Sequence, residues 1–484
     1  MPVGISRGKR VHSRSERLRG VLETLGEPPG RVQTGGPRPK DGCFVTTETV
    51  SAASEPGALD RLVTPRGERW RIIVFCLLAW TISNLDQSLF GYAIPDILRD
   101  FDVDLGVIGY ILAISFAVAA VLVSFGGWAA DKFGRRVVLV ALLASSAFFV
   151  GIQATARTLP ALTLWRALAF GLSGGLASVT AAYIAEAAPA RLRGMLIGVL
   201  QCGYPLGWFL ASLLAGPLLA THGWRPLFLF GFAVVPLAFL IGWKLPESRH
   251  FTETRQTRGG PESGASADRG GLAELFGPQN RRKAILCCLI FFAYGSAYAG
   301  TAFFFPTYFT QARGYTSSGA AYLVGLSYGI AALGYLGAAF VGEFVMTRRN
   351  TTALWCALGA VALIALLWLP STTLHDRILF ALTTSFFFGV NGVLATLLTE
   401  LFPTRIRTTA YAVCGSAPLS IGFAVYPMVV PAAVAALGWQ WALSLAIAPL
   451  LLIASGLTLF LPNLKSGAEV TDLAPPSDAT GAAR

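Results

Sequence analysis

Charged residues are scarce in this sequence of 484 amino acids. Aspartate, glutamate, lysine and arginine make up 13% of it, against about 25% in soluble domains, whereas 54% is hydrophobic. The mean hydropathy is +0.59. So few charged side chains cannot cover the surface of a soluble domain of this length. The composition therefore excludes the soluble globular class and predicts a polytopic membrane protein.

Signatures of covalent and metal chemistry are missing as well. The sequence has no H-E-x-x-H pair, no Walker loop and no nucleophile elbow, and its four histidines lie in expected tails or loops. The seven cysteines form no C-x-x-C and fall mostly in apolar runs, which is typical of small packing residues. These absences argue against an enzyme, a bound metal, a cofactor and ATP-driven pumping.

Twelve long apolar runs are present instead. About 20 helical residues, at 1.5 Å rise each, cross a hydrocarbon core of about 30 Å. We therefore predict an all-α polytopic membrane protein with twelve transmembrane helices in two six-helix bundles. The expected spans cover residues 72–94, 107–130, 137–153, 161–188, 195–219, 225–244, 284–309, 318–342, 352–370, 378–401, 409–436 and 440–461.

The stretches outside these runs are polar. Residues 1–69 are rich in Arg, Gly, Pro, Ser and Thr, and we expect a disordered basic cytoplasmic tail, with a lipid-attracted arm as the alternative. The chain is then expected to divide into an N-terminal bundle at 70–245, a cytoplasmic linker at 246–282, a C-terminal bundle at 283–462 and a cytoplasmic tail at 463–484.

Basic residues in the short turns predict the orientation. Every second turn carries at least two Lys or Arg, whereas the opposite turns carry at most one Arg each. Because positively charged loops stay inside, we expect both termini in the cytoplasm and the protein in the plasma (inner) membrane. The same placement accounts for the net charge of +12 without a nucleic-acid partner.

The two predicted bundles carry a repeated pattern. Four residues at the end of span 4 recur at the end of span 10, each 214 positions later, since 186 + 214 = 400 and 193 + 214 = 407. Duplicated six-helix halves place a substrate site between them at the membrane midplane. The repeated residues are Glu186, Pro189, Arg191 and Arg193, matched by Glu400, Pro403, Arg405 and Arg407.

Few ionisable residues fall inside the spans. Asp86 in span 1 and Arg166 in span 4 are the opposite pair placed well inside the first half, whereas Glu186 and Glu400 lie near span ends. A charge at membrane depth is costly and marks a functional site by default. Burial and a nearby Arg pull a carboxylate's proton affinity in opposite directions, so the pair suits proton coupling. A structural salt bridge between spans 1 and 4 is the alternative.

The turn GWAADKFGRR, from Gly127 to Arg136, joins spans 2 and 3. Its pattern G-x-x-x-D-[KR]-x-G-[KR]-[KR] resembles the loop between helices 2 and 3 of the major facilitator superfamily of secondary transporters. The resemblance covers about residues 70–462 and implies a latch between the bundles on the cytoplasmic side, in the outward-open state. That latch would comprise Gly127, Asp131, Gly134, Arg135, Arg136, Glu186, Arg193, Glu400 and Arg407. The corresponding second turn departs from the pattern, because Glu343 precedes Arg348 by five residues instead of four.

The first span, around SNLDQSLFGYAIP, resembles that of aromatic acid:proton symporters. Asp86, Gly91 and Pro95 match the pattern, but Ser83 replaces its first Asp. Arg166 matches the R-x-x-x-x-G pattern of helix 4, and span 5 resembles carboxylate symporters. The resemblance implies proton coupling through Asp86 and Arg166. Substrate-binding candidates are Asn84, Gln87, Arg166, Gln201, Tyr204, Tyr294, Tyr298 and Asn391.

The expected function is proton-coupled symport, in the direction of uptake, of a small organic anion such as an aromatic or aliphatic carboxylate. A sugar or polyol:proton symporter and a drug:proton antiporter are the alternatives within transport, and a membrane sensor of the same fold is the alternative outside it. The expected partners are a small-molecule substrate, protons and the lipid bilayer, and the expected state is a monomer. The second half offers no charge at the midplane, so it would hold the apolar body of the substrate.

Overall fold

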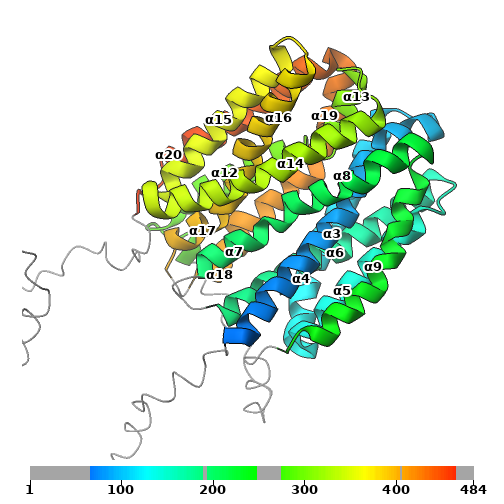
Figure 1. The fold of residues 1–484 in the computed structure, drawn as a ribbon. Helices are drawn as coiled ribbons and strands as arrows, with labels where there is room; N and C mark the ends of the chain where they lie inside the picture. The colour runs from blue at the N-terminus through cyan, green and yellow to red at the C-terminus, as the bar shows by residue number, and fades with distance from the viewer. Residues whose placement is uncertain (1–65, 189–192, 248–273, 404–405, 465–484) are drawn as a thin grey trace, which may run out of the picture. The chain divides into compact units, whose positions relative to one another are not determined.

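The protein is described here by a computed structural model that covers residues 66–188, 193–247, 274–403 and 406–464. These residues form helices and connecting turns, with no strand among them (Figure 1). The first half contains α3 (Arg66–Phe101), α4 (Leu105–Phe133), α5 (Arg135–Gln153), α6 (Leu159–Ala187), α7 (Arg193–Gln201), α8 (Gly203–Thr221) and α9 (Arg225–Lys244). The expected tails and most of the expected linker lie outside the described residues.

The second half repeats this order with more interruptions. It contains α12 (Arg281–Ala299), α13 (Phe305–Gln311), α14 (Ser317–Phe340), η3 (Val341–Val345), α15 (Arg348–Trp368), α16 (Thr373–Phe387), η4 (Phe388–Val390), α17 (Asn391–Leu401), α18 (Arg407–Ala410), η5 (Tyr411–Ser416), α19 (Ala417–Ala446) and α20 (Ala448–Leu459).

Within the described ranges, 11 helical stretches are long and apolar enough to cross a membrane. The last of them, Tyr411–Leu459, has 49 residues. At 1.5 Å per residue it would extend about 73 Å, more than twice the hydrocarbon thickness. It is broken at Gly438, whose φ of 76° and ψ of 167° are not helical. The stretch therefore makes two crossings, which gives the predicted twelve.

Pro95 and Pro306 lie inside helical segments. α3 continues past Pro95 to Phe101, and Pro306 lies in the first turn of the short helix α13. α3 remains helical after Pro95. Arg99 Nε donates to the Pro95 carbonyl at 3.3 Å. Proline is favoured in a first helical turn because the backbone N–H that it lacks has no partner there.

Threonine side chains begin four of the helices. Thr158, Thr316, Thr347 and Thr372 each accept a backbone N–H three residues later, at the starts of α6, α14, α15 and α16. Such caps satisfy donors that the first turn leaves unpaired. Each cap therefore fixes the residue at which the chain leaves a loop and enters a span.

Small residues set the spacing of the helices. A Cβ on Gly126 of α4 would lie 2.9 Å from the Gly175 Cα of α6, and Gly171 and Gly174 also face α4. Across the two halves, α8 packs beside α14 and α4 beside α19. Close backbone approach through glycine is a common way to pack helices in membranes, where no water drives them together.

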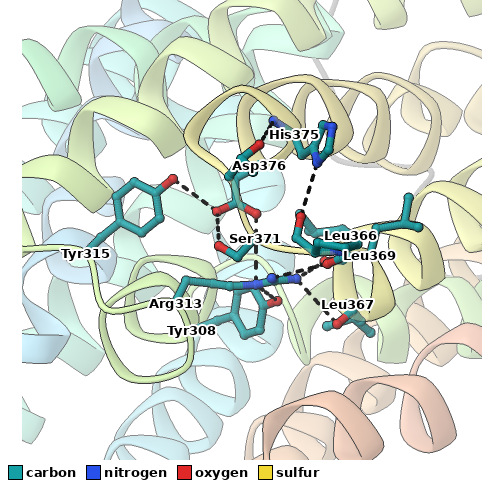
Figure 2. A network of polar contacts seen from close by, with 11 residues as sticks. Tyr308, Arg313, Tyr315, Leu366, Leu367, Leu369, Ser371, His375 and Asp376 are labelled. Carbon is teal, nitrogen blue, oxygen red and sulfur yellow. Dashed lines mark hydrogen bonds and ion pairs between the residues drawn. The ribbon is translucent and has the colours of Figure 1, made fainter.

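A polar network ties together the second half at the end where α13 and α14 meet (Figure 2). Arg313, between α13 and α14, donates from Nε to the Tyr308 hydroxyl at 2.8 Å and lies 3.9 Å from the Asp376 carboxylate. Its Nη2 donates to the carbonyl of Leu366 at the end of α15. The sequence did not point to Arg313, in the loop after α13, or to Asp376, in the first turn of α16.

Asp376 receives two further hydrogen bonds in this network. The Tyr315 hydroxyl donates at 3.0 Å and the Ser371 hydroxyl at 2.9 Å. Two causes raise the pKa of the Tyr315 phenol: burial, which is the larger, and the hydrogen bond to Asp376. This group therefore remains a donor at neutral pH. The network holds α13, α14, α15 and α16 in one arrangement.

Substitution of Asp376→Asn is expected to destabilise this end of the protein by about 2 kcal/mol, because hydrogen bonds to charged groups contribute about 1.5–3 kcal/mol each. The measurement is thermal unfolding of the purified protein in detergent. Arg377→Gln is the control, since Arg377 is exposed on the same helix and should leave the melting temperature unchanged. Equal melting temperatures for Asp376→Asn and the unsubstituted protein would contradict the assigned role.

Candidate functional site

A cavity of about 310 Å³ lies between the first six and the second six spans. Six of the predicted binding residues line it: Asn84, Gln87, Gln201, Tyr204, Tyr298 and Asn391. Tyr294 does not line the cavity; its hydroxyl donates to the Phe387 carbonyl at 3.3 Å. Arg166 also lies outside the lining and directly behind it.

The cavity extends from the middle of the spans toward the face at which α3 begins. Trp80, Ala177 and Ser416 line it on that side. The other end is bridged by contacts between the halves. The Ser317 hydroxyl of α14 donates to Asp96 of α3 at 2.8 Å. If the termini are cytoplasmic as expected, this arrangement is open to the cytoplasm and closed to the outside.

Glycines close the bridged end tightly. A Cβ on Gly109 of α4 would overlap the carbonyl of Pro427 in α19. A Cβ on Gly325 of α14 would likewise overlap the side chain of Ser212 in α8. Opening this end must therefore separate helix pairs that are in backbone contact.

Arg166 of α6 is fully buried. Its Nη1 donates to Gln87 Oε1 at 2.9 Å and to the Gln87 carbonyl at 3.4 Å. Its guanidinium carbon lies 4.4 Å from the ring centre of Phe90, 5.0 Å from that of Phe170 and 5.4 Å from that of Phe303. Nε and Nη2 have no hydrogen-bond partner in the described part of the chain. The cation is thus held by a neutral amide and aromatic faces.

The expected ion pair between Asp86 and Arg166 is absent from this structure. Asp86 is fully buried, and neither carboxylate oxygen has a hydrogen-bond partner among the residues described. Consecutive helical residues point about 100° apart. On α3, Gln87 faces Arg166 and Ser83 contacts Ser173 of α6 at 2.6 Å. Gln87 and not Asp86 is thus the α3 residue that holds Arg166 here, and Asp86 does not line the cavity.

Aromatic rings make up much of the cavity wall. Phe116, Phe170, Phe303 and Phe423 line it together with Tyr298. Tyr298 and Phe423 stack, with ring centres 5.5 Å apart and planes inclined by 19°. The sequence did not single out these phenylalanine rings, because nothing in their local pattern separates them from lipid-facing rings. The apolar wall comes from both halves, not from the second alone.

The repeated basic turns form equivalent ion pairs. Arg135 of α5 pairs with Glu186 of α6 at 3.0 Å, and Arg348 of α15 pairs with Glu400 of α17. Each pair joins helices of one half. Gly134 has a φ of 102°, which a side chain would strain, and ends α4. The other members of the predicted latch are less fully described.

The remaining members of the predicted latch lie at the same face of the protein as these two ion pairs. The backbone N–H of Arg136 donates to Glu247 at 3.2 Å, and Arg407 Nε is buried without a hydrogen-bond partner in the described residues. Gly127 lies near the end of α4. The side chains of Asp131 and Arg193 lie outside what the structure describes.

A π-helical turn explains the different spacing in the second half. The π-helical turn η3 (Val341–Val345) adds one residue before α15. Its Glu343 pairs with Arg348, the first residue of α15. A π-turn holds one more residue than an α-turn between hydrogen-bonded groups. Glu343, five residues before Arg348, therefore takes the position that Asp131 has four residues before Arg135.

Comparisons with known proteins agree with this architecture. A family model described as Major Facilitator Superfamily matches residues 75–417. The cis,cis-muconate transport protein of Acinetobacter baylyi is 32% identical over 377 residues, which cover 73% of this chain and 87% of that protein. A 4-hydroxybenzoate transporter of the same organism is 29% identical over 185 residues, 38% of this chain and 40% of that one.

Among solved structures, a bacterial homologue of the human lysosomal transporter Spinster, described as inward-facing and unoccupied, has the same fold. Its TM-score is 0.62 at 16% identity, with 82% of this chain and 96% of that chain covered.

Substitution of Asp131→Asn is expected to favour opening of the cavity at the face where α3 begins, because the latch that opposes this state loses a charge. A coupling of about 1–3 kcal/mol corresponds to a population shift of about 5–150-fold. The rate at which a maleimide modifies a Ser420→Cys reporter in the cavity measures the shift. Lys132→Gln, an exposed neighbour, is the control. Unchanged labelling in Asp131→Asn would exclude a latch at this residue.

Proposed function

Because this chain belongs to the Major Facilitator Superfamily of membrane transporters, we propose that it imports a small organic anion, an aromatic or aliphatic carboxylate, together with protons. The proposal places it in the plasma membrane with both termini in the cytoplasm. The observation that carries it is the unpaired guanidinium of Arg166 beside the central cavity.

A buried cation without an anion is costly, and a ligand that supplies the anion removes that cost. Arginine keeps its charge under all ordinary conditions. Its Nε and Nη2 atoms lie on one edge of the planar guanidinium and match the two oxygens of a carboxylate. These are the two atoms that have no hydrogen-bond partner among the described residues.

The rest of the cavity suits the body of such an anion. The rings of Phe116, Tyr298 and Phe423 offer flat apolar surfaces. The amide of Asn391 and the hydroxyl of Tyr204 offer hydrogen bonds from other parts of the wall. The relatives that carry cis,cis-muconate and 4-hydroxybenzoate support a substrate of this class.

Asp86 is the proposed carrier of the coupled proton. An ionised carboxylate without a partner at membrane depth costs several kcal/mol. We propose that Asp86 is protonated in the arrangement described here. Its neutral form leaves the charge of Arg166 for the substrate to balance, so proton and anion bind together.

Uptake into proteoliposomes under an inward proton gradient tests the proposal directly. Radiolabelled cis,cis-muconate or 4-hydroxybenzoate is expected to accumulate and to be released by a protonophore. Accumulation of neutral sugars alone would replace the proposal with a sugar symporter. Binding of a carboxylate without any movement would replace it with a sensor.

The Arg166→Lys variant should bind these carboxylates about 10–100-fold more weakly, a loss of about 1.4–2.8 kcal/mol. A point charge replaces the planar fork that holds two oxygens at once. Isothermal titration of the detergent-solubilised protein measures the affinity. Arg157→Lys, at an exposed position before α6, is the matched control. Undiminished affinity in Arg166→Lys would remove Arg166 from the binding site.

The Asp86→Asn variant mimics the protonated form permanently. It should bind substrate and exchange it across the membrane, yet it should fail to accumulate substrate against a gradient. Its affinity should also no longer depend on pH. Counterflow and gradient-driven uptake, measured on the same proteoliposomes, separate these activities. Accumulation at the unsubstituted level would assign the coupling proton to another group, with Glu186 and Glu400 the next to test.

A further inference from the structure

Gln87 occupies the position on α3 from which Arg166 is held. Its side chain is buried, lines the cavity and contacts Arg166 Nη1 through Oε1 at 2.9 Å. The oxygen must face the guanidinium, because arginine has only donors to offer. The amide nitrogen lies on the other side and makes a long contact of 3.5 Å with the Ala169 carbonyl.

Three cavity-lining residues contact Arg166, and Gln87 is the polar one. The other two, Phe170 and Phe303, present ring faces to the guanidinium. A carboxylate that leaves the cavity for Arg166 must pass between these three side chains. The Gln87 hydrogen bond is therefore the polar contact that this passage breaks or rearranges.

We infer that the Gln87 amide is an internal occupant of Arg166 which the carboxylate of the substrate displaces, so that Gln87 sets the affinity for anions. The inference rests on the proposed function. The neutral amide lacks the Coulomb attraction that an anionic carboxylate has for the guanidinium, so the carboxylate displaces it. The amide satisfies Nη1 only, and a carboxylate that comes from the cavity to the Nε and Nη2 edge has to move the Gln87 side chain away from Arg166.

A carboxylate attached at the same position should behave differently. Being part of the chain, it would reach Arg166 at a high effective concentration that no free substrate matches. Gln87→Glu should thus close the site to anions by occupying it. Gln87→Met keeps the length of the side chain but removes the amide oxygen, so it should leave Arg166 open to the substrate.

The experiment compares dissociation constants of the full-length protein in detergent for cis,cis-muconate and 4-hydroxybenzoate. Gln87→Glu is expected to weaken binding at least tenfold at neutral pH. Gln87→Met is expected to bind within about threefold of the unsubstituted protein, or more tightly. Ser420→Asp adds the same charge elsewhere in the cavity wall and should weaken binding several-fold less than Gln87→Glu.

Each outcome separates this inference from the proposed function. If the unsubstituted protein binds and Gln87→Glu binds equally well, Gln87 is not an occupant of Arg166. If Gln87→Met loses at least tenfold in affinity, Gln87 is a direct ligand or a structural residue and the inference is wrong. This outcome decides the matter even if Gln87→Glu fails to fold. If the unsubstituted protein binds neither carboxylate, the proposed function falls first and the inference with it.

Discussion

A guanidinium at membrane depth without an anionic partner is the constraint on which this structure depends. Arg166 is kept in place by one amide and three aromatic faces, supplied by α3, by α6 and by the turn between α12 and α13. Cation–π contacts and a neutral hydrogen bond reduce the cost of burying the charge but do not cancel it. A cavity lies beside this charge, and under the proposed function the carboxylate of the substrate reaches Arg166 from it and balances the charge.

The duplicated halves share equivalent ion pairs at their turns, but they contribute different side chains to the cavity and its surroundings. Arg135–Glu186 and Arg348–Glu400 fix equivalent turns, and the π-turn around Glu343 restores a register that the sequence spacing breaks. Within the cavity, by contrast, the cation behind the wall comes from the first half, whereas the second half contributes aromatic, hydroxyl and amide groups. A substrate between them therefore meets two different surfaces.

Hydropathy and capping residues are local signals, so the sequence predicted the helical class, the twelve crossings and most span ends. Residues such as Asn84, Gln201 and Asn391 were found because polar side chains inside spans are rare. The ion pair of Asp86 with Arg166 is not formed in this arrangement, in which Gln87 contacts Arg166, and periodicity alone does not choose between these two neighbours on α3. Arg313 and Asp376 could not be linked, because their contact depends on how the loop after α13 packs against the start of α16.

The packing of α3 limits how proton and anion can be coupled. A Cβ on Gly207 of α8 would lie 2.7 Å from Asn84 Cβ and from the Leu85 nitrogen, so α3 and α8 are in backbone contact. A rotation of α3 by one residue step, which would bring Asp86 to Arg166, would break this contact. Under the proposed function, coupling would then act through the balance of charge within the first half, since charges interact over several ångströms where water is excluded. In that case the proton and the anion need not share a hydrogen bond, and Gln87 is free to serve as the side chain that the substrate replaces.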